Sequence, residues 1–452
     1  MSPRASFAWS PRERVSKLAY TALWIVATPA IAAYLLWRSR RQPAYRGGWS
    51  ERFLGRYSNR AHAPCIWIHA VSVGETRAAA PLVEALRARY PELPLLVTHM
   101  TPTGRDTAIA LFGDRVSHAF LAYDYPFAVT RFFRHWRPVV GIVMETEIWP
   151  NLMAAARDAG VPMLLANGRL SAKSLRSTMR WPALMRPAAR GFARILAQSD
   201  ADATRFASLT GEANGNHIVR VGNLKFDIAV PAAQRELASR FRDRVACDRS
   251  NAPRTILLFA STREGEEEAI FDAWQRRALR GFEHAAVSSP LLVVVPRHPQ
   301  RFDTVAALAK SRGLRTQRRS DKLSVGADTT AWIGDSMGEL FAYYLLADVA
   351  YVGGSIVPLG GQNLIEAAAA GCPILIGPHT FNFSEASDEA VHVGAAMRVA
   401  NFDALIDAAL ALAADDARRG RMAGAGIAFA AAHRGATQRT MEIIGGTIGG
   451  ST

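Results

Sequence analysis

The sequence contains very little cysteine. Its 452 residues include only Cys65, Cys247 and Cys372, which lie far apart and form no CxxC pair. Such an odd and scattered set supports neither a zinc site nor a disulfide framework, and it fits a reducing compartment. Zinc-finger patterns, RNA-binding aromatic signatures and basic helical arms are also missing, so nucleic acid is not an expected partner.

Acidic residues are in the minority. The 54 Lys and Arg residues outnumber the 39 Asp and Glu residues, which gives a formal net charge of +15. A basic surface suits anionic lipid or acidic substrates, although a coding bias explains the same excess. Hydrophobic residues make up 49% of the chain and charged residues 21%, as in globular proteins. The length predicts two domains of roughly 150–220 residues each.

Long hydrophobic runs are limited to one. Residues 18–37 carry no charge over 20 positions, and a helix of this length spans about 30 Å, the hydrocarbon thickness of a bilayer. The small residues Ala30 and Ala32 also resemble a signal-peptide cleavage site, and a buried core helix is a third interpretation. The apolar run continues to Trp37, as in an uncleaved anchor, so we predict one N-terminal membrane anchor.

The rest of the chain alternates between short apolar runs and helical patterns. Strands are expected at 66–71, 95–99, 139–144, 162–166 and 194–197, and then at 255–260, 291–295, 349–351 and 374–376. This order predicts an α/β protein with two Rossmann-like sheets in tandem. The expected divisions are an anchor and basic connector at 1–45, a first domain at 46–225, a hinge at 226–250, a second domain at 251–425, and a C-terminal helix with a disordered tail at 426–452.

Carboxylates follow two strands of the first domain. Glu75 stands where the strand 66–71 gives way to a helix, and there it is either a helix cap or a general base. Glu145 and Glu147 follow the strand 139–144, and their spacing points them to opposite sides of an extended chain. Lys225, near the hinge, is either an ordinary surface lysine or the partner of a phosphate or carboxylate.

The second domain places glycines and basic residues after its strands. Arg297 follows the strand 291–295, and the segments 334–340 and 352–366 combine glycines with the start of a helix. Backbone N–H groups at such turns bind anions and sugar hydroxyls. One turn is weak evidence, but several along one domain predict a phosphate-containing ligand.

These segments together resemble the bacterial Kdo transferases, the 3-deoxy-D-manno-octulosonic acid transferases of lipopolysaccharide assembly. The resemblance covers nearly the whole chain, and the stretches that carry it are HAVSVGE, YDYPFAVTRFF, ETEIWPNL, NGRLSAKS, GNLKFD, PRHPQRF, GDSMGEL and VGGSIVPLGGQN. It implies a GT-B fold of two Rossmann-like domains that face one cleft, and inverting transfer of Kdo from CMP-Kdo to a lipid A precursor, with neither a metal nor another cofactor.

The resemblance also implies roles for single residues and a location for the protein. Glu75 corresponds to the general base, and Glu145 and Lys225 correspond to residues that stabilise the transition state. The implied contacts to CMP are Pro296, Arg297, Met337, Gly338, Glu339, Asn363, Leu364, Ile365 and Glu366. Membrane lipids are further expected partners, because the family works at the inner membrane with its catalytic domains facing the cytoplasm.

One segment departs from the family pattern, and two other functions stay open. Many relatives have GGHN-PLE where this chain has Gly360 to Glu366 with Gln362 at the histidine position, so a role for an imidazole there is in doubt. Another GT-B enzyme that uses a UDP-sugar is the first alternative. A membrane-tethered nucleotide-binding scaffold without turnover is the second, although the joint presence of Glu75, Glu145, Lys225 and Arg297 argues against it.

Overall fold

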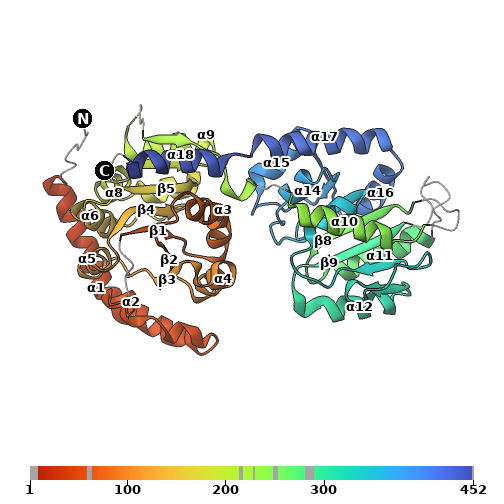
Figure 1. Ribbon diagram of the computed structural model, residues 1–452, viewed down its shortest axis with the longest axis horizontal. Coiled ribbons are helices and arrows are strands. Elements are labelled where there is room, and N and C mark those ends of the chain that lie inside the picture. The colour runs from red at the N-terminus through yellow and green to blue at the C-terminus, as the bar shows by residue number, and fades with distance from the viewer. Residues whose placement is uncertain are drawn as a thin grey trace. The chain divides into compact units, whose positions relative to one another are not determined.

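The computed structural model describes residues 9–58, 64–212, 217–227, 230–247, 253–279 and 290–449. The chain forms two compact units (Figure 1): unit 1 comprises residues 1–227 and 434–452, and unit 2 comprises residues 228–433. Each unit contains a seven-stranded sheet whose strand pairs are all parallel. The prediction of two Rossmann-like sheets in tandem is therefore confirmed.

The sheet of unit 1 reverses its strand order at its centre. Its strands are β1 (Cys65–His69), β2 (Leu95–His99), β3 (Ser117–Phe120), β4 (Pro138–Met144), β5 (Met163–Gly168), β6 (Arg194–Ala197) and β7 (Ile218–Arg220). They lie in the order β3-β2-β1-β4-β5-β6-β7. Ligands of open parallel sheets bind beyond the carboxyl ends of the strands at such a switch point, which here lies between β1 and β4.

Both faces of this sheet are buried. Along β1, Cys65 and Trp67 pack into one hydrophobic cluster, whereas Ile66 and Ile68 pack into another. Side chains alternate between the faces of a strand, so a strand covered on both sides has an unbroken apolar run. This is why the strands of unit 1 are readable in the sequence as short continuous runs without polar alternation.

Helices connect the strands of unit 1. They are α1 (Pro11–Ser39), α2 (Trp49–Leu54), α3 (Val73–Arg89), α4 (Pro102–Phe112), α5 (Pro126–Trp136), α6 (Pro150–Asp158), α7 (Ala172–Thr178), α8 (Pro182–Arg190), α9 (Asp200–Thr210) and α18 (Ala436–Gly449). Short 3-10 turns add η1 (Pro43–Arg46), η2 (Gly113–Arg115) and η3 (Leu224–Phe226). The turn η3 carries Lys225.

Helix α1 lies along the side of unit 1. Among the described residues it is the one helix whose length and apolar composition would allow it to cross a membrane. It contains the predicted anchor 18–37, and it contacts η1, α6 and α8. The ring of Trp24 stacks on Tyr123 at 5.8 Å between centroids, and the hydroxyl groups of Thr28 and Tyr125 are 2.6 Å apart. One side of the helix is therefore attached to the domain.

The C-terminal helix returns to unit 1, although unit 2 precedes it in the chain. Figure 1 shows α18 (blue) among the elements of the N-terminal half, and it contacts α3, β4 and η3. Asp227 accepts hydrogen bonds from the backbone N–H groups of Gly435 (3.0 Å) and Thr437 (2.7 Å) at the start of this helix. The expected C-terminal segment 426–452 contains this helix, which continues to Gly449, and the residues after it lie outside the described part of the chain.

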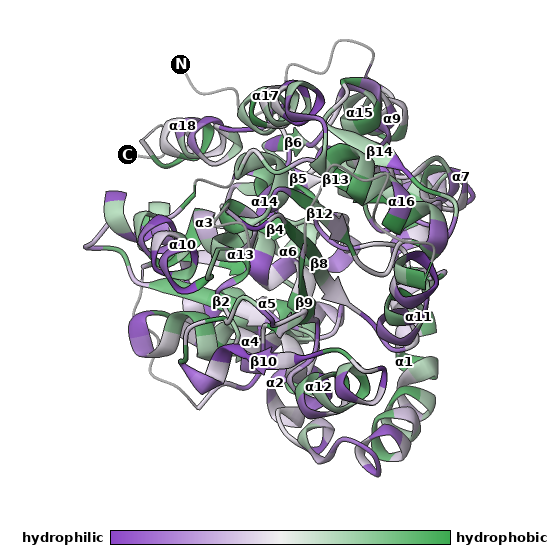
Figure 2. Cartoon of the chain, turned by 90° about the vertical axis from the view of Figure 1, so that its right-hand side faces the viewer, coloured by the Kyte–Doolittle hydropathy of each residue, from purple (hydrophilic) through white to green (hydrophobic). Residues whose placement is uncertain are grey.

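Unit 2 repeats the same architecture. Its strands are β8 (Ile256–Thr262), β9 (Leu291–Pro296), β10 (Thr316–Arg318), β11 (Ala331–Ile333), β12 (Val349–Val352), β13 (Ile374–Ile376) and β14 (Ala396–Arg398), in the order β10-β11-β9-β8-β12-β13-β14. The switch point lies between β8 and β12, and Figure 2 shows the hydrophobic character of these central strands. The cluster beneath them includes Phe259, Trp274 and Leu405.

The helices of unit 2 include a segment that we expected to be a linker. They are α10 (Ala232–Arg244), α11 (Glu266–Leu279), α12 (Phe302–Ser311), α13 (Leu340–Leu346), α14 (Ile365–Ala369), α15 (Ser384–His392), α16 (Phe402–Ala413) and α17 (Asp416–Ala432), with the 3-10 turns η4 (Pro299–Arg301) and η5 (Arg319–Asp321). Helix α10 lies within the predicted hinge 226–250, yet it packs on α13 and fully buries Phe241. The boundary between the units therefore follows Asp227 directly.

Candidate active site

Two carboxylates flank the switch point of unit 1. Glu75 belongs to the first turn of α3, which follows β1, and Glu145 directly follows β4. β1 and β4 are hydrogen-bonded neighbours with β1 on one side of the reversal and β4 on the other. The sheet topology thus brings Glu75 and Glu145 to the same edge of the sheet, although they are far apart in the sequence.

Glu75 takes part in the cap of its own helix. Ser72 is the N-cap residue, and its hydroxyl accepts a hydrogen bond from the backbone N–H of Glu75 (3.4 Å). The carboxylate in turn accepts hydrogen bonds from the backbone N–H of Val71 (2.9 Å) and from the Ser72 hydroxyl (3.0 Å). The Ser72 hydroxyl satisfies one donor that the helix start leaves open, and the Glu75 carboxylate fixes the turn before the helix.

Burial also changes the titration of this carboxylate. Burial raises the pKa of Glu75 to about 7, and the nearby carboxylates of Glu145 and Glu147 raise it further, against the hydrogen bonds from Val71 and Ser72. Glu75 is 9% exposed and belongs to none of the hydrophobic clusters of unit 1. A carboxylate with a pKa near the working pH accepts a proton most efficiently.

Gly74 leaves open space beside this carboxylate. Its φ is not among the positive values of the chain, so the turn itself does not require glycine. A Cβ atom added at Gly74 would meet only the Ser72 hydroxyl, at 3.9 Å. The backbone conformation therefore does not require glycine here, and the structure leaves room beside the Glu75 turn.

Glu145 and Lys225 form an ion pair. Their Oε1 and Nζ atoms are 2.7 Å apart, and their side chains are 22% and 31% exposed. Glu145 has a φ of 58°, a left-handed conformation that is unfavourable for a residue with a Cβ atom. Strain of this kind collects at functional sites, where the surrounding structure maintains it. The pair places the Lys225 ammonium near the carboxylates of Glu75 and Glu147, which interact with Glu145.

Glu147 is bonded to a different partner from that of Glu145. Its Oε2 atom accepts a hydrogen bond from the indole N–H of Trp149 (2.6 Å), and burial raises its pKa. Glu145 and Glu147 thus have different side-chain partners, Lys225 and Trp149.

His69 and Trp149 are site neighbours that the sequence analysis did not single out. His69 ends β1 and is fully buried, and its ring lies 5.9 Å from that of Trp149, edge to face. Burial lowers the pKa of His69 to about 3, so the imidazole is neutral. A histidine in an apolar strand gives no signal for this position, because only the fold brings it to Trp149.

In unit 2, arginines gather beyond the carboxyl end of β9. Pro296 is the buried last residue of this strand, and the backbone N–H of Arg297 donates to the carbonyl of Thr262 on β8 (2.9 Å). Burial lowers the pKa of His298, and the guanidinium groups of Arg263, Arg297 and Arg301 lower it further. A positive potential of this kind favours an anion.

The predicted segment 337–339 follows β11 and leads into α13. Met337 is 57% exposed, and Gly338 has a φ of +79° with no atom within 4 Å of an added Cβ. Glu339 pairs with Arg319 (3.0 Å) and accepts a hydrogen bond from the Ser336 hydroxyl. Gly338 thus offers an accessible stretch of backbone, whereas the charge of Glu339 is already balanced.

The predicted segment 363–366 follows β12. The side-chain oxygen of Asn363 accepts a hydrogen bond from the N–H of Ile365 (3.0 Å) at the start of α14. Leu364 and Ile365 are buried at 1% and 0% exposure, so only their backbone atoms can reach a ligand. Glu366 lies on α14 with intermediate exposure. The three predicted segments therefore lie at the carboxyl ends of β9, β11 and β12, which belong to one sheet.

Comparison with known proteins identifies the class of fold first. The crystal structure of a glycosyltransferase from Rickettsia africae ESF-5 is similar to this chain with a TM-score of 0.54 at 13% identity, and the match covers 86% of this chain and 99% of that one. At this identity the likeness concerns the fold alone. Two switched parallel sheets in tandem with this likeness define the GT-B fold of glycosyltransferases.

The sequence comparisons identify the family. Residues 47–228 match the family model described as 3-Deoxy-D-manno-octulosonic-acid transferase (kdotransferase). The 3-deoxy-D-manno-octulosonic acid transferase of Bordetella pertussis is 44% identical over 92% of this chain and 96% of that protein. The enzyme of the same name from Haemophilus influenzae is 37% identical over 94% of this chain and 97% of that protein. The chain belongs to the Kdo transferase family, glycosyltransferases of lipopolysaccharide biosynthesis.

Proposed function

We propose that this protein transfers Kdo from CMP-Kdo to a hydroxyl group of a lipid A precursor with inversion at the anomeric carbon. Family membership supports the sugar and the reaction class. The observation that carries the mechanism is the carboxylate of Glu75, which combines a pKa of about 7 with a place at the switch point. The proposed mechanism requires no metal ion and no further cofactor.

The reaction exchanges one bond for another at the anomeric carbon. The bond from this carbon to the phosphate oxygen of cytidylate breaks, and its electron pair leaves with CMP. The acceptor oxygen forms the new bond from the opposite face, so the configuration inverts. The acceptor hydroxyl loses its proton in this step, and positive charge grows on the sugar while negative charge grows on the phosphate.

Glu75 takes the proton from the acceptor hydroxyl. In its ionised form the carboxylate is a base of suitable strength, and the Val71 and Ser72 donors hold it in one orientation. The open space at Gly74 allows the acceptor to approach the carboxylate. General base catalysis of this kind contributes typically a factor of about 10²–10⁴ to the rate.

Glu145 and Lys225 stabilise the charges of the transition state. The ammonium group of Lys225 is held at 2.7 Å from the Glu145 carboxylate, so it does not need to reorganise during the reaction. A fixed cation favours the negative charge that develops on the leaving group or on the acceptor oxygen, and the neighbouring carboxylate favours the cationic sugar.

Unit 2 binds the cytidylate of the donor. The positive potential around Arg297 and the exposed backbone at Gly338 suit a phosphate, and the turn at Asn363 suits sugar or base hydroxyl and amide groups. These features support a donor site on unit 2, and Glu75 supports an acceptor site on unit 1.

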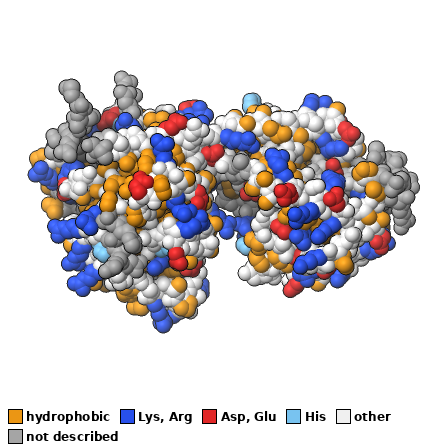
Figure 3. Space-filling model, viewed as in Figure 1, with side chains coloured by type: hydrophobic (Ala, Val, Ile, Leu, Met, Phe, Trp, Pro, Cys, Tyr) orange, Lys and Arg blue, Asp and Glu red, His pale blue; other side chains and the backbone are white. Residues whose placement is uncertain are grey.

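Helix α1 tethers the enzyme to the cytoplasmic face of the inner membrane. Its apolar residues Leu23, Val26 and Leu36 are 65%, 77% and 53% exposed, and the basic residues of unit 1 include several along this helix (Figure 3). Acyl chains of the acceptor stay in the bilayer, so a tether confines enzyme and acceptor to one surface and raises their encounter rate.

A reconstituted transfer reaction tests the proposal. Purified protein is incubated with CMP-Kdo and a lipid A precursor in detergent, in the presence of EDTA, and the lipid product is analysed by mass spectrometry. The proposal expects a mass increase of one or more Kdo residues and a thermal shift with CMP but not with UDP. A shift with UDP only would favour a UDP-sugar enzyme, and the absence of any shift or product would favour a scaffold without turnover.

A further inference from the structure

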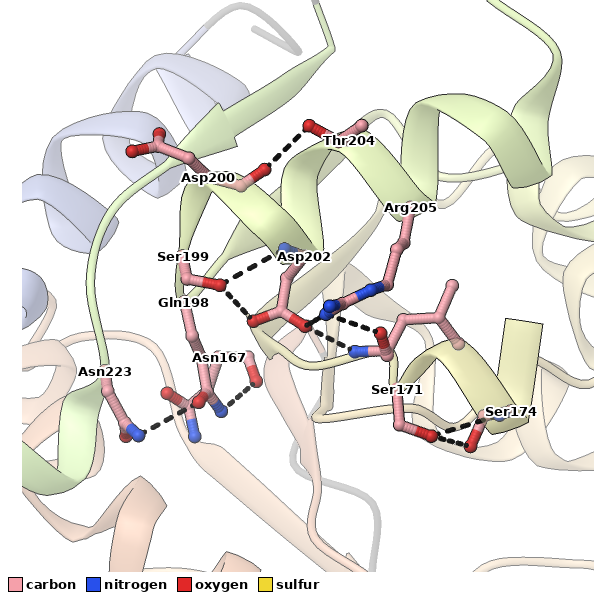
Figure 4. Close-up of polar contacts among 11 residues, drawn as sticks. Asn167, Ser171, Ser174, Gln198, Ser199, Asp200, Asp202, Thr204, Arg205 and Asn223 are labelled. Atoms are coloured by element: carbon pink, nitrogen blue, oxygen red, sulfur yellow. Dashed lines mark hydrogen bonds and ion pairs between the residues drawn. The ribbon is translucent and has the colours of Figure 1, made fainter. Parts of the chain in front are cut away.

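Three amide side chains end three neighbouring strands of unit 1. Asn167 is the penultimate residue of β5, Gln198 follows β6, and Asn223 follows β7 shortly before η3. These strands are consecutive in the sheet, and β4 with Glu145 at its end lies next to β5. Figure 4 shows the three amides in one row along the carboxyl edge of the sheet.

The amides form a continuous chain of hydrogen bonds. The side-chain N–H of Asn223 donates to the side-chain oxygen of Gln198 (2.9 Å), whose own N–H donates to the backbone carbonyl of Asn167 (2.9 Å). Each of these bonds joins the ends of two adjacent strands. Their members are neutral, so the chain adds no charge to an edge that already carries Glu75, Glu145 and Glu147.

Asn167 and Asn223, at the two ends of this series of hydrogen bonds, both bond to the backbone of η3. The side-chain oxygen of Asn167 accepts a hydrogen bond from the N–H of Leu224 (2.9 Å), and that of Asn223 accepts one from the N–H of Lys225 (2.9 Å). Asn167 is fully buried and has a φ of 54°, a left-handed conformation that asparagine tolerates better than most residues. The strained residue therefore bonds directly to the turn that carries Lys225.

The same hydrogen-bonded group also contacts the ion pair of Glu145 and Lys225. The ammonium of Lys225 meets Glu145, and the backbone N–H of Glu145 donates to the carbonyl of Ala166, the residue before Asn167 (2.9 Å). A lysine side chain has four flexible bonds, so its ammonium is localised only when its backbone and its partner are both fixed. Here Glu145 fixes one end and the amides fix the other.

We propose that Asn167, Gln198 and Asn223 are positioning residues that hold the Lys225 ammonium against Glu145 for the transfer step. This inference rests on the proposed function of Lys225. In this proposal the amides act through the backbone of η3, by the bonds to the N–H groups of Leu224 and Lys225. Electrostatic stabilisation of a transition state depends on donors that are already in place, so a small displacement of η3 lowers kcat more than it changes donor binding.

The test uses the full-length protein and the variants Asn167→Gly and Gln198→Ala. Glycine keeps the left-handed backbone and removes only the acceptor for Leu224, whereas Gln198 is half-buried and its truncation is compatible with folding. Each variant is expected to lower kcat by about tenfold or more while KM for CMP-Kdo, which is bound by unit 2, stays within about twofold.

Two comparisons separate positioning from general damage. Ser199→Ala is the matched control, since Ser199 is next to Gln198 but caps α9 through Asp202, so it should lower the melting temperature and leave kcat unchanged. In a Lys225→Ala background, Asn167→Gly and Gln198→Ala should cause no further loss of kcat, because the residue on which they act is gone.

The outcomes are distinct. Unchanged kcat in both amide variants, or losses that add fully to that of Lys225→Ala, would overturn the inference. An equal loss in Ser199→Ala would do the same, because it would assign the effect to general destabilisation. If Lys225→Ala by itself keeps full activity, the proposed role of Lys225 fails, and any loss in the amide variants then has another cause.

Discussion

Glu75 in unit 1 and Glu266 in unit 2 occupy corresponding places. Each lies in the first turn of the helix that follows the strand on one side of the switch point, β1 in unit 1 and β8 in unit 2. Burial raises the pKa of both carboxyl groups. The two units therefore have a glutamate at the same position of the fold, and burial is the main cause of the raised pKa in both.

The two carboxylates differ in how their oxygen atoms are used. Glu266 is fully buried and accepts hydrogen bonds from the N–H groups of Arg263 and Gly354 and from the Tyr351 hydroxyl. These bonds join the turn after β8 to the glycine turn after β12. Glu75 is bonded only within its own turn among the described contacts, and it keeps some exposure. A carboxylate with full hydrogen bonding serves structure, whereas one with spare capacity can serve chemistry.

The largest expected effect comes from Glu75→Gln. The amide cannot accept the acceptor proton, so kcat should fall by a factor of about 10²–10⁴ while CMP still produces a thermal shift. Transfer assays and calorimetry on the same sample measure both quantities. Near-normal turnover in the folded variant would exclude Glu75 as the base. Glu75 and Glu266 would then no longer differ in function.

Lys225→Ala should have the next largest effect. The loss of one preorganised charge near the reacting atoms typically lowers kcat by about 10²-fold or more. The variant also leaves Glu145 without its cation, so its stability at neutral pH needs to be measured beside kcat. A loss that appears only in KM for the acceptor would assign Lys225 to binding instead of catalysis.

The pH dependence of the reaction tests the role of Glu75 without a mutation. A base with a pKa of about 7 must be ionised, so kcat/KM should rise about tenfold per pH unit below 7 and level off above it. The folded pKa lies above the ordinary value of 4.5, so this group binds more protons in the folded state, and its contribution to stability is lost as the pH rises from 4.5 through 7. A flat rate profile between pH 5 and 8 would contradict the assignment.

Glu266→Gln should have the smallest effect on the rate. One oxygen atom remains to accept bonds from three donors, so the free energy of unfolding should fall by about 1–3 kcal/mol per unsatisfied donor. The glycine turn at 353–354 then loosens, and KM for CMP-Kdo should rise by a few fold with little change in kcat. Denaturant unfolding and steady-state kinetics provide the two measurements, and a collapse of kcat with normal KM would show that Glu266 takes part in the chemistry.

The central strands were predictable because burial on both faces of the sheet requires a continuous run of apolar residues. The runs at β1, β2, β4, β9 and β13 were expected within a residue or two of their observed bounds. The strands β3, β7, β10, β11 and β14 were not expected. They have three or four residues each, and four of the five carry polar or basic side chains, such as Thr316-Gln317-Arg318 in β10. Edge positions tolerate such residues, since one side of an edge strand has no partner strand.

The sequence by itself determined the family, the two sheets, the apolar helix near the N-terminus and the identity of Glu75, Glu145, Lys225 and Arg297 as candidates. Local patterns and motifs carry this information, because strand runs, glycine turns and helix starts depend on neighbours along the chain. Only the tertiary structure decided that Lys225 meets Glu145 across 80 residues of sequence, that three amides hold its turn, and that α18 returns to unit 1. Contacts of this range depend on the order of strands in the sheet, which no local pattern encodes.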